Sequence, residues 1–391
     1  MINTKNKLFT IVGPSGSGKS TIASIFPTSQ TIVSFTTRSP RPGEINGKDY
    51  YFVDLETINT FSENNDLAEH VEYNGNHYGY QFSELQNKLS NGNCVAVVTK
   101  EGYQHLMSVP GLDSAIIPIF VKISYDDVVK HMQSRNDSEK NIKQRLKLFK
   151  NEARNLYYFK SVPNHIIFDI TGLTVDESKT EFAGLVSQFN DSQRIAIEGG
   201  DGAGKSTLIK RLKEDLSKDA FSFVQEPGST PDALKIREDI FSHPNYSDEH
   251  KAYLFAEARK SVNTELAMPE LAIGHSVIFD RSIVSSFIYQ TVDSKLEIKD
   301  IDNINGIVDN HYSLPDKLIY LDIDPEYAMS RMKDNQRTTN YLDLDSISHK
   351  QTIRDAFLDY TNNFPQHLVV DSKKLESSDE EYKRILDFIR N

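Results

Sequence analysis

Residues 13–20 read Gly-Pro-Ser-Gly-Ser-Gly-Lys-Ser and decide the fold of the first half of this chain. They fit the phosphate-binding loop pattern, in which a glycine and four further residues precede Gly-Lys-Ser or Gly-Lys-Thr. The apolar, β-branched run 8–12 predicts a buried strand before the loop, and residues 21–26 can continue as a helix after it. Glycines let consecutive backbone N–H groups turn inward around a phosphate, and the helix N-terminus adds partial positive charge. An ordinary Gly/Ser turn is the alternative, but both flanking elements favour a phosphate site.

The same pattern occurs a second time, at residues 199–206, as Gly-Gly-Asp-Gly-Ala-Gly-Lys-Ser. It follows the apolar run 194–198 and opens the run 207–212. Two chance matches, each in the right context, are far less probable than one. The chain is therefore predicted to hold two α/β nucleotide-binding domains in tandem, residues 1–190 and 194–391. Each is expected to be a P-loop domain with a parallel sheet flanked by helices and a lid.

Both loops have the residues that bind ATP and Mg²⁺ in such sites. The lysines, Lys19 and Lys205, would reach the β- and γ-phosphates, and the hydroxyls of Ser20 and Ser206 would bind the metal. The candidate ATP-binding residues are Gly13, Ser15, Gly16, Gly18, Lys19, Ser20, Thr21, Gly199, Gly202, Gly204, Lys205, Ser206 and Thr207.

Composition narrows the class of protein. The 391 residues suffice for two domains with their own cores, and 38% hydrophobic with 26% charged residues is typical of soluble globular proteins. No apolar run approaches membrane-spanning length, and we expect no signal peptide, because the first residues lead straight into the first predicted strand. The net charge of −12 argues against a general nucleic-acid surface. The single cysteine, Cys94, excludes an intrachain disulfide framework, so a cytoplasmic protein is expected.

A turn-rich segment, residues 36–44, holds two arginines that could bind a dianionic phosphate, although a solvated loop is the alternative. The first half contains, in this order, the phosphate loop, Ser34, Arg38, Arg41-Pro-Gly-Glu, residues 47–50, Glu69 and Gly-Asn-His-Tyr-Gly at 75–79. This order resembles guanylate kinase over nearly all of residues 7–190. This resemblance implies that Glu69 reads the guanine edge. It implies that the acceptor phosphate is held by Ser34, Arg38, Arg41, Tyr50 and Tyr78, and that the lid supplies the catalytic residues Arg135 and Arg145.

The first half also departs from that family's pattern. Tyr80 stands where the family commonly has serine or threonine, and His131 stands for one lid arginine. Val97 and Thr99 fall at places where the family has acidic residues near the base and the metal. These changes leave three alternatives for the first half: a guanylate kinase, a kinase for another or a modified base, or a binding module with little turnover.

The second half has its own series of motifs. Glu226-Pro-Gly follows the run 221–224, Phe255 and Arg259 lie four residues apart on a predicted helix, and Asp280-Arg281 ends the strand predicted over 275–279. Ser285-Ser286 and Tyr-Gln at 289–290 follow. This order resembles thymidylate kinase over essentially all of residues 194–391. The family's usual arginine before Glu-Pro-Gly is Gln225 here.

The thymidylate kinase resemblance implies roles for these residues. Phe255 would stack on the thymine ring, and Asp201 would approach the sugar 3′-hydroxyl. Glu226 and Asp280 would lie near the metal and its waters. The acceptor-binding candidates of this half are Asp201, Glu226, Arg237, Phe255, Arg259, Arg281, Ser286 and Gln290. The mobile catalytic cations would be Arg331, Lys333 and Arg337, an arrangement that resembles the bacterial type, and a homodimer through this domain is expected.

Phosphate acceptors need no strong general base, because the attacking oxygen is already anionic; catalysis is positioning and charge neutralisation. We therefore predict an ATP- and Mg²⁺-dependent bifunctional kinase for (d)GMP-type acceptors in the first half and dTMP-type acceptors in the second. Such a fusion suits an organism, such as a virus, that raises its DNA precursors together. A kinase acting on DNA or nucleosides is the remaining alternative, and the two acceptor-side arginine pairs count against it.

Overall fold

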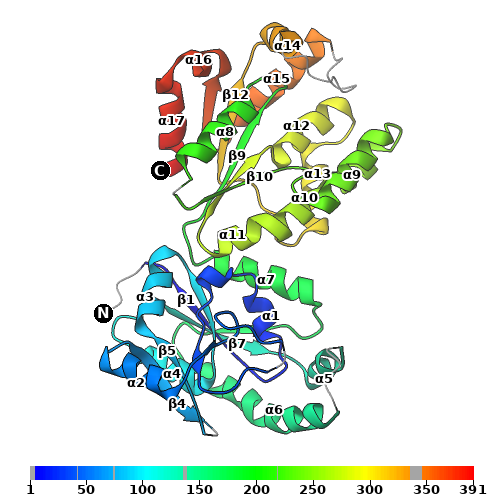
Figure 1. Cartoon of the computed structure of the whole chain (residues 1–391). Coiled ribbons are helices and arrows are strands. Elements are labelled where there is room, and N and C mark those ends of the chain that lie inside the picture. Colours follow the sequence, from blue (N-terminus) through cyan, green and yellow to red (C-terminus); the bar gives the residue numbers. More distant parts are fainter. Residues whose placement is uncertain (1–4, 42, 74, 135–138, 218, 335–345) are drawn as a thin grey trace. The chain divides into compact units, whose positions relative to one another are not determined.

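The computed structural model describes residues 5–41, 43–73, 75–134, 139–217, 219–334 and 346–391. The chain divides into two compact units, Met1–Asn190 and Asp191–Asn391 (Figure 1). Each unit is an α/β domain whose parallel sheet is flanked by helices. Within the described ranges, no helix is long and apolar enough to cross a membrane.

The first unit is built around a four-stranded parallel sheet with the strand order β6-β1-β7-β8. Its strands are β1 (Leu8–Val12), β6 (Cys94–Val97), β7 (Ile116–Lys122) and β8 (Ile166–Asp169). All five residues of β1 are buried, as expected for a strand covered on both faces. The surrounding helices are α1 (Lys19–Ala23), α3 (Phe82–Asn91), α4 (Lys100–Met107), α5 (Tyr125–Ser134), α6 (Glu139–Phe159) and α7 (Val175–Ser187).

A second, smaller sheet in the first unit was not predicted. Its strand order is β3-β2-β5-β4, with β4 and β5 forming an antiparallel hairpin. The strands are β2 (Phe35–Thr36), β3 (Tyr51–Phe52), β4 (Leu67–Tyr73) and β5 (Asn76–Gln81), and α2 (Leu55–Glu63) lies between β3 and β4 in the chain. Within the apolar run 31–35 only Phe35 belongs to a strand, and Thr31 makes an isolated bridge to Val95.

The second unit holds a five-stranded parallel sheet in the order β10-β11-β9-β12-β13. Its strands are β9 (Arg194–Gly199), β10 (Phe221–Gln225), β11 (Ser276–Asp280), β12 (Lys317–Asp322) and β13 (His367–Asp371). The helices are α8 (Lys205–Asp215), α9 (Pro231–Ser242), α10 (Asp248–Val262), α11 (Met268–Ala272), α12 (Ile283–Asp293), α13 (Ile298–Val308), α14 (Pro325–Asp334), α15 (Ile347–Asn362), α16 (Ser372–Ser377) and α17 (Asp379–Arg390).

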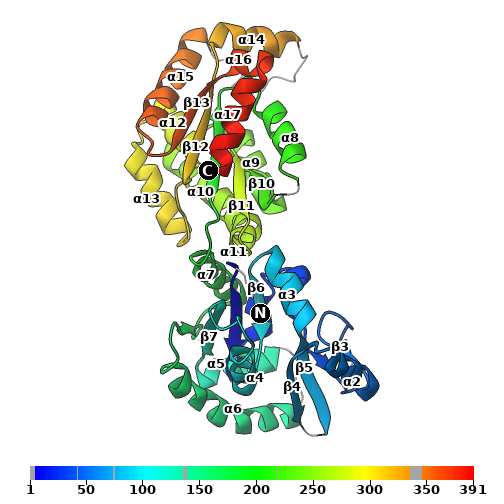
Figure 2. The same ribbon diagram turned by 90° about the vertical axis from the view of Figure 1, so that its left-hand side faces the viewer.

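Alternating residues of the second sheet belong to two different cores. Ile195 and Ile197 of β9 pack in a cluster with side chains of α8 and α17, whereas Ala196 packs with α12 and α15. Figure 2 shows α8 and α17 together on one side of this sheet. Because successive side chains point to opposite faces, this division shows that the sheet is covered on both sides.

The strand order places the ligand crevice of each unit. The first strand of each unit, β1 or β9, lies between two strands that come later in the chain. In open parallel sheets, ligands bind at the carboxyl edge where the order reverses in this way. Both phosphate loops leave their strands at that edge, and in the second unit Asp280 ends the neighbouring strand β11.

Candidate active sites

The two phosphate loops adopt the same backbone conformation. Gly16 and Gly202 both have φ of +83°, in the left-handed region that favours glycine. A Cβ atom added to Gly13 or Gly199 would lie 2.8 or 2.9 Å from a carbonyl oxygen of the adjacent strand. Glycine is therefore required at these positions by close packing as well as by φ, in both halves of the chain.

The loop lysines fold back over their loops. The ammonium of Lys19 donates to the carbonyl oxygens of Gly13 and Pro14, both at 2.7 Å. The ammonium of Lys205 donates to the carbonyl oxygen of Gly199 at 2.6 Å. Burial lowers the pKa of Lys19 to about 8 and that of Lys205 to about 7. An enclosed ammonium of this kind is poorly hydrated, so a bound phosphate stabilises it strongly.

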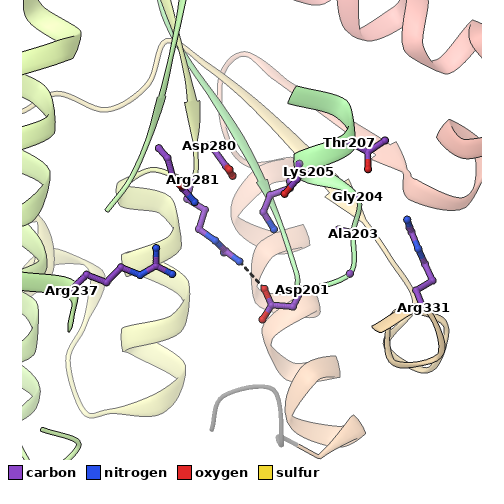
Figure 3. Close-up of a pocket in the computed structure, with 12 residues that line it drawn as sticks. Asp201, Ala203, Gly204, Lys205, Thr207, Arg237, Asp280, Arg281 and Arg331 are labelled. Atoms are coloured by element: carbon purple, nitrogen blue, oxygen red, sulfur yellow. Dashed lines mark hydrogen bonds and ion pairs between the residues drawn. The ribbon is translucent and has the colours of Figure 1, made fainter. Parts of the chain in front are cut away.

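A cavity of about 470 Å³ opens over the second loop. Arg281 directly follows β11, and its Nη2 atom donates to Asp201 Oδ1 of the loop at 3.0 Å. Figure 3 shows this pair close to Lys205, with Arg237 and Arg331 on opposite sides of the view. Lysine and three arginines on one cavity suit a polyphosphate and a second phosphate group.

A larger pocket of about 540 Å³ adjoins these residues and has a more apolar lining. Phe255 and Gln290 line it, and Gln290 Oε1 is buried without a hydrogen-bond partner among the described residues. One wall is a buried network in which Arg259 donates to Glu226 at 2.8 Å, Asn305 at 2.6 Å and Ser286 at 3.0 Å. An aromatic face beside fixed polar groups can bind a flat heterocycle.

Glu226 is buried and paired with an arginine. The resemblance implies that it lies near the metal with Asp280. The residue is 5% exposed, and its carboxylate pairs with Arg259. It lines the larger pocket, whereas Asp280 lines the cavity over the loop. Glu226 thus lies in the wall of the larger pocket.

In the first half, the second sheet gathers the candidate phosphate-binding residues. Arg38 pairs with Glu44 at 2.9 Å, and its guanidinium lies 5.2 Å from the ring centre of Tyr50. The rings of Tyr50 and Tyr78 are 6.2 Å apart. Arg41 is exposed, and its backbone N–H donates to Glu44. Arg38, Tyr50 and Tyr78 thus form one cluster.

The residues expected to lie near the purine base in this half are more enclosed than the candidate phosphate-binding residues. Glu69 is buried, its Oε1 atom lies 3.5 Å from His105 Nδ1, and burial raises its pKa. Tyr80 is 5% exposed, with its hydroxyl 3.5 Å from the carbonyl oxygen of Val97 and hydrogen-bonded to the side chain of Ser34. The hydroxyl of Thr99 accepts from the backbone N–H of Gly102 and caps α4. Tyr80 thus fills space beside Glu69, and Thr99 supplies a helix cap where the family has an acid.

Several predicted lid residues lie outside what the structure describes. Arg135 and Arg337 fall in undescribed segments, and the side chains of Arg145 and Lys333 are likewise undescribed. Arg331 is described: its guanidinium pairs with Glu376 of α16, and Nη1 would lie 3.7 Å from a Cβ atom placed on Gly204. Arg331 therefore lies beside the second phosphate loop.

Comparisons with known proteins agree with this geometry. A thymidylate kinase family model matches residues 197–381, and a guanylate kinase family model matches residues 5–171. The thymidylate kinase of Pediococcus pentosaceus is 32% identical over 205 residues, which cover 50% of this chain and 98% of the relative. That of Anoxybacillus flavithermus is 35% identical over 180 residues, which cover 44% and 85%.

The chain belongs to the thymidylate kinase family. This membership is carried by its second half, and a guanylate kinase-like domain precedes it in tandem. The predicted order of the two domain types is therefore confirmed. The relatives named here align with the thymidylate kinase half.

Two acidic residues near these sites were not predicted from the sequence. Glu198 ends an otherwise apolar run and is fully buried, where it accepts hydrogen bonds from Ser282 and Ser285. Glu152 of α6 accepts from the backbone N–H of Ser15 at 2.6 Å, on the first phosphate loop. An acidic residue at the end of an otherwise apolar strand could have identified Glu198 as a candidate site residue. No sequence pattern marked Glu152, because it is one of many charged residues on a polar helix.

Oxygen donors in the thymidylate kinase half suit Mg²⁺. Ser206 and Asp280 line the same cavity as Lys205. Mg²⁺ in kinase sites usually binds one or two carboxylates, substrate phosphates and waters, so this set fits the ion. In the guanylate kinase-like half Ser20 lies in the first turn of α1, but Val97 and Thr99 contribute no carboxylate.

Proposed function

We propose that this chain is a bifunctional nucleoside monophosphate kinase. Its second half transfers the γ-phosphate of ATP to dTMP, and its first half transfers it to GMP or dGMP. The observation that carries the proposal is that each unit has a phosphate loop with an enclosed lysine and separate candidate acceptor groups, Arg38 with two tyrosines in the first and Arg237 with Arg281 in the second.

In the second half, the acceptor lies between the larger pocket and the loop cavity. Phe255 supplies an aromatic face for thymine, and the Arg259 network supplies fixed polar groups at the ring edge. Arg237 and Arg281 line both cavities, so they hold the acceptor phosphate where the two meet. Asp201 pairs with Arg281 and lies near the sugar.

The reaction needs little beyond positioning. The acceptor phosphate oxygen attacks the γ-phosphorus of ATP, the bond to the β,γ-bridging oxygen breaks, and ADP leaves. Lys205, Arg281 and Arg331 neutralise the charge that develops on the transferred group. Mg²⁺ held by Ser206 and Asp280 supplies further charge neutralisation on the phosphates when bound. Ser20 of the first phosphate loop corresponds to Ser206.

In the first half, the Arg38 cluster takes the acceptor phosphate, and the carboxylate of Glu69 accepts from the N–H and NH₂ donors of guanine. Glu69 is buried and has a raised pKa. A pair of donors from guanine satisfies such a carboxylate, whereas the ring nitrogen of adenine at the same edge only accepts hydrogen bonds.

A panel of acceptors tests both assignments on the full chain. ADP formation is measured with ATP, Mg²⁺ and each common deoxy- and ribonucleoside monophosphate in turn. We expect dTMP and a guanine nucleotide to exceed the others by at least about tenfold in kcat/KM, the effect of one unpaired hydrogen-bonding group. A preference for dCMP or dAMP over both would overturn the proposal.

A second candidate function concerns the first half alone. Tyr80 beside Glu69, and the absence of a carboxylate at Val97 and Thr99, favour a binding module with little turnover. The test uses Lys205→Ala, which leaves only the first half able to act. Calorimetric binding of dGMP without ADP formation would support the module, and ADP formation with dGMP would exclude it.

A further inference from the structure

The buried carboxylate of Glu198 lies under the start of α12. Its Oε1 atom accepts from the backbone N–H of Ser282 at 2.8 Å, the hydroxyl of Ser282 at 2.8 Å and the backbone N–H of Ser285 at 3.2 Å. Its Oε2 atom accepts from the hydroxyl of Ser285 at 2.7 Å. Four donors satisfy the carboxylate, although its side chain has no exposed surface.

These hydrogen bonds fix a turn that is conformationally costly. Arg281 has φ of +67°, which few residues other than glycine adopt. On its C-terminal side, Ser282 caps α12 by accepting from the backbone N–H of Val284 at 3.1 Å. Glu198 thus holds the helix start from beneath while Arg281 turns back toward the phosphate loop.

A relay of hydrogen bonds joins Glu198 to the guanidinium of Arg281. The Ser285 hydroxyl has one proton, which it donates to Glu198. Its oxygen then accepts from Arg281 Nη1 at 3.3 Å, while Arg281 Nη2 donates to Asp201 at 3.0 Å. The carboxylate therefore decides which way the hydroxyl points, and the hydroxyl helps to hold the guanidinium over the loop.

Charge supports the same connection. Burial lowers the pKa of Arg281, but Tyr289, Asp201 and Glu198 together raise it above its ordinary value. Conversely, burial raises the pKa of Glu198, and Arg281 with the two serines opposes that shift. The carboxylate of Glu198 and the guanidinium of Arg281 therefore stabilise each other's charged forms, although the Ser285 hydroxyl lies between them.

We propose that Glu198 is a positioning residue of the thymidylate site, which acts through Ser285 to hold Arg281 where the acceptor phosphate binds. This inference rests on the proposed role of Arg281 in binding that phosphate. Glu198 itself touches neither substrate nor metal.

The test is Glu198→Gln in the full chain, because glutamine keeps the shape but replaces one acceptor oxygen by a donor. We expect KM for dTMP to rise about 10- to 100-fold, the effect of losing one hydrogen bond to a charged group. KM for ATP should change by less than about threefold. Ser285→Ala should give a similar rise, and Glu198→Gln added to Ser285→Ala should add little, because both act through one relay.

Tyr382→Phe is the matched control, since it removes a partly buried hydrogen bond to Asp215 on the other core of this unit. It should lower the melting temperature without moving KM for dTMP. Equal rises in KM for dTMP and ATP, or additive effects of the two site variants, would overturn the relay. If Glu198→Gln does not fold, Ser285→Ala and calorimetric dTMP binding carry the test. Failure of the wild-type chain to phosphorylate dTMP would instead overturn the proposed function.

Discussion

The guanidinium of Arg259 donates through Nε to the carboxylate of Glu226 at 2.8 Å, and both side chains are more than nine-tenths buried. The other donors of Arg259 are directed at Asn305 and Ser286. The pair thus builds one wall of the thymidylate pocket before any nucleotide binds.

Glu226→Gln tests this wall. Removing the carboxylate leaves a buried guanidinium without its counter-charge, so we expect the free energy of unfolding of the thymidylate kinase half to fall by about 3–5 kcal/mol. Denaturant unfolding measures the change. Lys235→Gln is the control, because its pair with Asp232 is exposed and should contribute little to stability. Equal effects of the two variants would contradict the buried network.

Gly79→Ala tests the second sheet of the guanylate kinase-like half. A Cβ atom at Gly79 would lie 2.0 Å from the carbonyl oxygen of Glu69 and 2.4 Å from Phe35 Cζ. The β4–β5 hairpin and β2 must therefore separate, and we expect loss of binding and turnover of the guanine nucleotide. Activity toward dTMP in the same chain should persist, which provides an internal control. Gly306→Ala, where a Cβ meets no atom within 4 Å, should leave both activities intact.

Cys94 reports on the core of the guanylate kinase-like half. The thiol is buried, donates to Gln30 Oε1 at 3.1 Å, and burial raises its pKa to about 12. Because the thiolate is the reactive form, we expect reaction with a disulfide reagent at pH 8 to be at least about 100-fold slower in the folded chain than in guanidinium. The reagent's colour change measures this single thiol. Comparable rates in the two states would contradict the burial of β6.

Glu152→Gln tests the contact between α6 and the first phosphate loop. The carboxylate accepts from the backbone N–H of Ser15 and raises the pKa of Lys19 against the effect of burial. ATP phosphates need the same N–H and repel the same charge, so we expect the variant to bind an ATP analogue about 3- to 10-fold more tightly.

Calorimetry in a Lys205→Ala background isolates this loop. Lys150→Gln, an exposed change on the same helix, is the control and should weaken binding slightly if it has any effect. Weaker binding by Glu152→Gln would show that the carboxylate supports the loop and does not compete with ATP.

Much of the fold could be predicted from local pattern. The two loops, the strands before them and the parallel sheets follow from glycine spacing and apolar runs, which are encoded within about ten residues. The β3-β2-β5-β4 sheet was missed because β2 and β3 have two residues each, too few to show a period. Strand β2 pairs with β3 on one side and with the distant β5 on the other, where Phe35 lies opposite Gly79.

The sites were predictable to a different degree. The order of motifs along the chain was enough to assign Arg38 and Tyr50 to the first site and Arg281 and Asp201 to the second, where each pair lies close together. The contacts of Glu198 were hidden, because its serine partners lie more than 80 residues later and serine alone predicts nothing. The pairing of Arg259 with Glu226 was also hidden, because the two residues lie 33 positions apart in the chain.

The most direct test of two separate kinase sites is ADP formation by Lys19→Ala and Lys205→Ala in the full chain, with dGMP and dTMP as acceptors. Each variant is the matched control for the other, since the two lysines have the same contacts in their loops. We predict that Lys19→Ala loses turnover of dGMP alone and that Lys205→Ala loses turnover of dTMP alone, each by at least about 100-fold. Retention of dGMP turnover by Lys19→Ala, or loss of both activities in one variant, would contradict two independent sites.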